Sequence, residues 1–176
     1  MTTDSEAFAF GFSFMQLALM KAAQPSDAVA ASVSLTYALG AEGHRSQARR
    51  MLDCLALPID PSALFEGDWD RKRQLAELIS KLLAESHSQR VMWCFRLGCD
   101  LSALSSARFL GFSSAQVNAF TEKLNSESKE CGVPFETLRE FIWAAADTTV
   151  AVPEFMTIVT GLVDRVAEHL RSQHAT

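Results

Sequence analysis

Cysteine and histidine, the side chains that most often bind transition metals, are scattered along this chain. Cys94 and Cys99 are the closest two of the four cysteines, and on a helix a separation of five residues turns their side chains about 140° apart. No C-x-x-C or H-x-x-x-H pair occurs. We therefore expect neither a metal nor a cofactor, and we interpret the cysteines as reduced structural thiols.

Catalytic motifs are equally absent from the sequence. There is no G-x-S-x-G elbow for a nucleophilic serine, and the eight glycines never gather into a phosphate-binding loop. Glu136 and Glu140 are one helical turn apart but flank Arg139, which is typical of a solvated helix surface. The residues thus favour no reaction class, and whether the chain is an enzyme stays open at this point.

Two short basic clusters could recognise an anion or an acidic partner. Arg45 and Arg49 are one turn apart and would share a helix face, and Arg71 and Arg73 form the second cluster. The simplest interpretation is solvation, and contact with RNA phosphates is the sharper alternative. A net charge of -5 and a pI near 5.4 argue against a general nucleic-acid binder.

Aromatic side chains form the other candidate surface. They would be either plain core, or the lining of a pocket for an apolar ligand between helices, or a surface for a partner. Four of them alternate with small residues near the N-terminus, which alone would indicate a strand, but no second alternating run exists to pair with it. We therefore predict a helix there. The six aromatic residues that we propose for this pocket or partner surface are Phe8, Phe10, Phe12, Phe14, Trp93 and Trp143.

Helical periodicity dominates the rest of the chain. Apolar residues recur at three- and four-residue steps over 155–170, with Pro153 in the first turn of that helix. Ser113 and Gln116 predict a capping box, and further helices are expected over 26–39, 48–55 and 75–83. Pro134 opens another helix, whose predicted buried face is Phe135, Leu138, Phe141, Ile142 and Ala145.

Composition and length fit one globular domain spanning 1–176, with 48% hydrophobic and 21% charged residues. The predicted fold class is all-α, a compact orthogonal or bundle-like domain of seven or eight helices, with 28–39 and 91–104 at its centre. The longest uncharged stretches, 7–20 and 28–41, are too short to span a membrane. Because the first residues lack the basic start of a secretory signal, we expect a soluble, cytoplasmic protein.

These observations rank three functions. The leading hypothesis is a non-enzymatic protein-interaction module, meaning an adaptor, chaperone or regulator, that binds another protein or a second copy through an apolar helical surface or groove. A mean hydropathy of +0.07 supports a covered apolar face. The alternative is a small-molecule-binding or catalytic helical protein with an aromatic-lined pocket. The third is an anion or RNA binder that uses the local arginine clusters, although nucleic acid is an unlikely partner on charge grounds.

Overall fold

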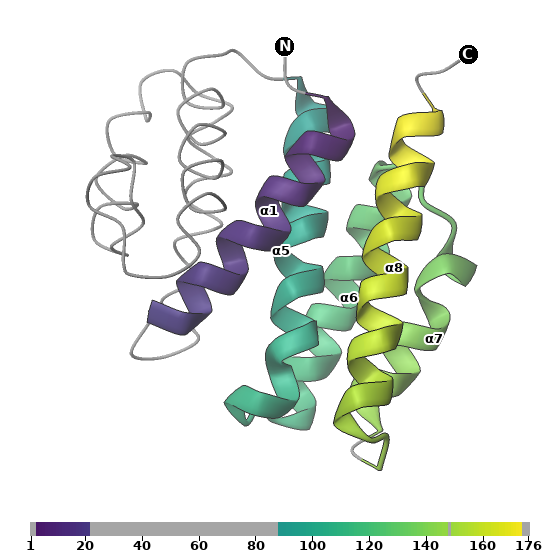
Figure 1. The fold of residues 1–176 in the computed structure, drawn as a ribbon. Coiled ribbons are helices and arrows are strands. Elements are labelled where there is room, and N and C mark those ends of the chain that lie inside the picture. Colours follow the sequence, from purple (N-terminus) through teal and green to yellow (C-terminus); the bar gives the residue numbers. More distant parts are fainter. Residues whose placement is uncertain (1–2, 22–87, 148, 174–176) are drawn as a thin grey trace.

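A computed structural model describes residues 3–21, 88–147 and 149–173, and every regular element within these segments is a helix (Figure 1). The prediction of an all-helical chain is therefore confirmed for the described residues, which form five helices and no strand. The helices predicted over 26–39, 48–55 and 75–83 lie outside these segments. The five are α1 (Asp4–Lys21), α5 (Gln89–Leu110), α6 (Ser114–Glu130), α7 (Phe135–Ala146) and α8 (Val152–Ser172).

Helix α5 is the central element of the described segments, as its apolar sequence predicts. It packs against α1, α6 and α7, and Figure 1 shows it between α1 on one side and α6 on the other. A helix that is apolar around most of its circumference buries most of its faces. Its fully buried side chains include Cys94, Phe95, Leu97, Leu101 and Leu104.

The phenylalanine-rich segment forms helix α1, so its predicted helical state is confirmed. Phe8, Phe10 and Phe14 have almost no exposed surface, and the rings of Phe10 and Phe95 stack with their centroids 5.2 Å apart. Alternation of large and small residues serves close helix packing here, because Gly11 lies directly against the backbone of α5. The alternation of phenylalanine with small residues therefore belongs to a closely packed helix and does not form a strand.

Helix α6 begins with the predicted capping box. The Ser113 hydroxyl accepts a hydrogen bond from the Gln116 backbone at 3.2 Å, and the Gln116 side chain accepts one from the Ser113 backbone at 2.9 Å. Helix α5 ends at Leu110, and the next residue, Gly111, adopts a left-handed conformation with φ of 69°. Local signals in the sequence thus fix the α5–α6 connection.

Helices α7 and α8 form an antiparallel hairpin, in which the rings of Phe141 and Phe155 lie 6.1 Å apart. The predicted buried stripe of α8 is confirmed and comprises Phe155, Val159, Leu162, Val166 and Leu170. The prediction for α7 was wrong at Phe135, which is 43% exposed. Phe135 is six positions before Phe141, which turns the two side chains about 120° apart, so Phe135 lies outside the buried face formed by Leu138, Phe141, Ala144 and Ala145.

Within the described segments, no helix has both the length and the hydropathy that crossing a bilayer requires.

Candidate functional site

The exposed apolar side chains are concentrated on one part of the fold. Among the described residues, every large hydrophobic side chain classed as exposed belongs to the α7–α8 hairpin. Scattered single apolar residues are normal on a protein surface, whereas their confinement to one supersecondary unit marks a candidate interaction site. The exposed fractions are 43% for Phe135, 73% for Trp143, 46% for Val152 and 43% for Met156.

Trp143 is the most exposed of these residues. It lies in the last turn of α7. The opposite face of this helix is buried in the core through Leu138, Phe141 and Ala145. The core residues fix the rotation of α7, so the ring of Trp143 is held on the outside by the packing of its neighbours. Val152 and Met156 begin α8 and lie near the same end of the hairpin, just beyond the short connection that follows Trp143.

The connection between the two helices is held by hydrogen bonds. Arg108 of α5 donates to the carbonyl oxygen of Val150 at 2.7 Å and to that of Asp147 at 2.9 Å. The Asp147 carboxylate accepts from both the backbone N–H and the hydroxyl of Thr149. These two bonds lower the pKa of Asp147. Asp147, four residues after Trp143, therefore carries a negative charge, and the nearby Arg108 guanidinium also lowers its pKa.

Acidic side chains accompany Trp143 along the outer face of α7. Glu140 precedes Trp143 by three residues and Glu136 by seven, spacings that place all three on one side of a helix. Both glutamates are exposed. Arg139, four residues before Trp143, shares this side of α7 and lies over the ring of Phe135, with its guanidinium carbon 5.7 Å from the ring centroid. Trp143 thus lies in a strip whose two carboxylates and one guanidinium leave a net charge of -1.

The six aromatic residues predicted as a partner or pocket surface do not come together. Phe8, Phe10 and Phe14 are buried in the α1–α5 contact. Phe12 and Trp93 are partly buried against the core. Only Trp143 reaches the surface fully, on α7. The arginines of the two predicted basic clusters, Arg45, Arg49, Arg71 and Arg73, lie outside the described residues.

A buried acid occupies the α5–α6 interface. Glu127 has an exposed fraction of 1%, and neither of its carboxyl oxygens forms a hydrogen bond of ordinary geometry. Arg96 Nε lies 3.5 Å from Glu127 Oε1, while burial and the neighbouring Asp100 carboxyl raise the pKa of Glu127 to about 10. The group is therefore protonated near neutral pH. Because solvent hardly reaches it, we assign it to the core and not to catalysis.

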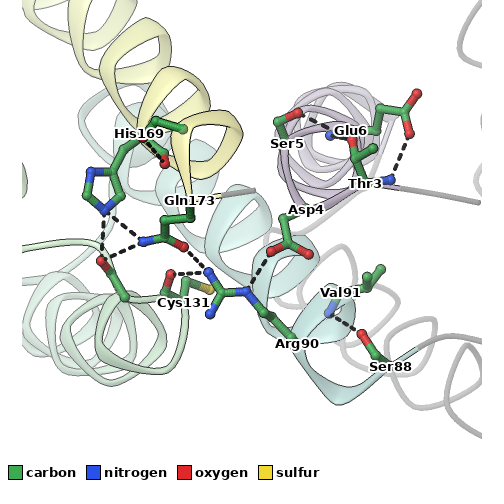
Figure 2. A network of polar contacts seen from close by, with 12 residues as sticks. Thr3, Asp4, Ser5, Glu6, Ser88, Arg90, Val91, Cys131, His169 and Gln173 are labelled. Carbon is green, nitrogen blue, oxygen red and sulfur yellow. Dashed lines mark hydrogen bonds and ion pairs between the residues drawn. The ribbon is translucent and has the colours of Figure 1, made fainter. Parts of the chain in front are cut away.

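A polar network joins four parts of the chain at the end of the bundle away from the α7–α8 connection (Figure 1 and Figure 2). Arg90 of α5 donates to Asp4 of α1 at 2.6 Å and to the carbonyl oxygen of Cys131 at 2.9 Å. The same guanidinium also bonds to the side chain of Gln173, which follows α8. His169 Nε2 lies 2.9 Å from the carbonyl oxygen of Gly132. This network connects the ends of α1, α5, α6 and α8.

Two free thiols lie close to this network in the core. Cys94 and Cys131 are fully buried. A hydrogen bond to Cys94, together with burial, raises the pKa of Cys131 far above its ordinary value, so this side chain stays a thiol and is a poor nucleophile. In the part of the chain that the structure describes, no three metal-binding side chains come together.

The sequence does not predict several of these residues. Val152 and Met156 carry no signal that distinguishes them from other apolar residues at the start of a helix. Glu127 could have been noticed, because it continues the spacing of Phe120 and Leu124 on the buried face of α6. Arg90 and Asp4 are 86 residues apart in sequence, and no local pattern predicts such a pair.

No model of a known protein family matches this chain, and no curated protein or solved structure matches it either.

Proposed function

We propose that the chain is a non-enzymatic protein-interaction module, an adaptor, chaperone or regulator, that binds its partner through the outer face of the α7–α8 hairpin. One observation carries the proposal: the exposed large hydrophobic side chains of the described residues all lie on this hairpin. Burying them against a partner would remove apolar surface from water, which is the main favourable term in protein association.

Trp143 would be the anchor of the interaction. Tryptophan is enriched among the few interface residues that supply most of the binding free energy. Its presentation on a helix whose rotation is fixed by buried neighbours, and beside a turn braced by Arg108, would reduce the entropy lost on binding.

The alternative of an aromatic-lined ligand pocket has less support. Phe8, Phe10 and Phe14, three of the residues predicted to line it, have exposed fractions of at most 1%. Phe10 and Phe14 each pair closely with the Phe95 ring. Such contacts are those of a filled core. No specific contact among the described residues favours the third hypothesis, anion or RNA binding.

The number of helices and the cellular compartment are also proposals. We propose that the full chain forms one domain of seven or eight helices and works in the cytoplasm. The additional helices rest on the apolar periodicity at 26–39, 48–55 and 75–83. The free thiols Cys94 and Cys131 support a reducing compartment.

A photo-crosslinking experiment in the native host tests this function. The full chain carries p-benzoylphenylalanine in place of Trp143, or in place of Asn118 as a control exposed on α6. We expect a discrete protein adduct from position 143 and none from position 118. Equal adduct patterns from both positions, or none from position 143, would contradict docking through the hairpin.

A further inference from the structure

We infer that the partner of the α7–α8 hairpin is a basic amphipathic helix, whose apolar face covers Trp143 and whose lysine or arginine side chains meet Glu136 and Glu140. This inference rests on the proposed function and adds the chemistry of the partner to it.

The charge of the outer face supports a basic partner. Glu136 and Glu140 are exposed, one turn apart, and share a helix side with Trp143. Arg139, four residues before Trp143, is exposed on the same side of α7, so the two carboxylates and one guanidinium of this strip carry a net charge of -1. The strip beside Trp143 therefore has a net negative charge, and a partner with positive charge would associate faster and more specifically.

The distribution of the exposed apolar residues over two helices fits a helical partner. Trp143 comes from α7, whereas Val152 and Met156 come from α8, so an element that covers all three must lie along both helices. A third helix packed on an antiparallel pair does this with ordinary side-chain interdigitation. Lysine or arginine residues at a spacing of four on that helix would match the one-turn separation of Glu136 and Glu140.

The same charges disfavour other occupants. Two copies of this chain, each with a net charge of -5, would bring like-charged strips together if they met on this face. An anionic lipid surface or a nucleic acid would meet the same repulsion. A basic protein segment is thus the occupant whose chemistry complements both the apolar anchor and its acidic surroundings.

Titration with designed peptides tests the inference. The probe is a labelled amphipathic peptide of leucine and lysine, roughly 18 residues long so that it forms a helix when bound, and its counterpart carries glutamate at every lysine position. Binding to the full chain is followed by fluorescence anisotropy. The variants are Trp143→Ala and the double change Glu136→Gln with Glu140→Gln, and the control is Glu122→Gln with Glu130→Gln, two exposed acids on α6.

We expect the lysine peptide to bind, the glutamate peptide not to bind, and added salt to weaken binding. Trp143→Ala and the α7 double change should each reduce the affinity about tenfold, whereas the α6 control should change it less than about twofold. If Trp143→Ala reduces affinity but the α7 double change does not, or if both peptides bind equally, the basic partner is refuted while apolar docking stands.

Three other outcomes are also decisive. Unchanged peptide affinity in Trp143→Ala would refute the proposed docking site itself. A lysine peptide that fails to bind the unmodified chain would refute the inferred partner. Concentration-dependent dimerisation that Trp143→Ala abolishes, measured by light scattering, would replace the basic helix by a second copy of this chain.

Discussion

Gly11 of α1 and Gly98 of α5 bring the two helices into direct backbone contact. A Cβ atom on Gly11 would lie 2.1 Å from the carbonyl oxygen of Phe95, and one on Gly98 would lie 2.1 Å from that of Phe8. Neither neighbour can move aside as a flexible side chain would, because both are main-chain atoms. The close crossing of α1 and α5 therefore requires a residue without a Cβ atom at one position in each helix.

Replacing Gly98 by alanine should separate these helices. We expect Gly98→Ala to lower the free energy of unfolding by about 3 kcal/mol, near the upper end for overpacking, because backbone has to shift. Chemical denaturation followed by circular dichroism measures the change. Gly161→Ala in α8 is the matched control: beyond the adjacent backbone of its own helix, no atom lies within 4 Å of its added Cβ, so the substitution should stabilise the protein by up to about 1 kcal/mol. Equal effects of the two substitutions would contradict the close crossing.

Glu127 should make stability fall as the pH rises. Its pKa is about 10 in the folded protein and about 4.3 in an unfolded chain, so between these values the folded state holds a proton that the unfolded state has released. The stabilising effect of this proton is complete below about pH 4.3 and is lost progressively up to about pH 10, by at most about 1.4 kcal/mol per pH unit.

The substitution Glu127→Gln isolates this effect. A neutral amide keeps the shape of the protonated acid, so the variant should match the original chain near pH 4 and exceed its free energy of unfolding near pH 8. Denaturation curves at a series of pH values give the difference, in which the titration of all other groups cancels. A difference that does not grow between pH 5 and pH 9 would mean that Glu127 is ionised in the folded protein.

The sequence predicts the helices of this fold better than the contacts between them. Helix positions follow from local signals such as the Ser113–Gln116 capping box and the stripe that includes Phe155 and Leu162, which act within a few residues of themselves. The role of Gly98 depends on Phe8 and Phe12 of α1, which are 90 and 86 residues earlier in the chain, and no local pattern encodes it.

The candidate site shows the same division. Trp143 was identified from its residue type, but its exposure depends on the rotation that Phe141 and Leu138 impose on α7 once they meet the core. The apolar periodicity of α7 also predicted a buried Phe135. This residue is the first of the helix, where the periodicity alone does not fix which way the side chain points. Pairing of α7 with α8 through Phe141 and Phe155 resolves the direction.

The ion pair between Arg90 and Asp4 should fasten the start of α1 to α5. Asp4 is buried, and Arg90 Nε lies 2.6 Å from its carboxylate, an arrangement that raises the pKa of Arg90. Because the guanidinium is partly exposed and screened, we expect a coupling of about 1–2 kcal/mol between the two residues. A double-mutant cycle with Asp4→Asn and Arg90→Gln measures this coupling as the departure of the double variant from additivity. Additive losses would show that the two side chains contribute independently.

Truncation of the two tryptophans of the described segments should affect stability to different extents. Trp93 packs against the core and has the guanidinium of Arg96 4.9 Å from its ring centroid, so Trp93→Ala should cost about 2–3 kcal/mol of unfolding free energy, less than the full value for a buried aromatic residue. Trp143 is 73% exposed, and Trp143→Ala should change stability by no more than about 0.5 kcal/mol. Phe95→Ala, at a fully buried ring, gives the upper reference of about 3–5 kcal/mol. A cost for Trp143→Ala comparable to that for Trp93→Ala would place its ring in a folding contact and remove it as a free anchor for a partner.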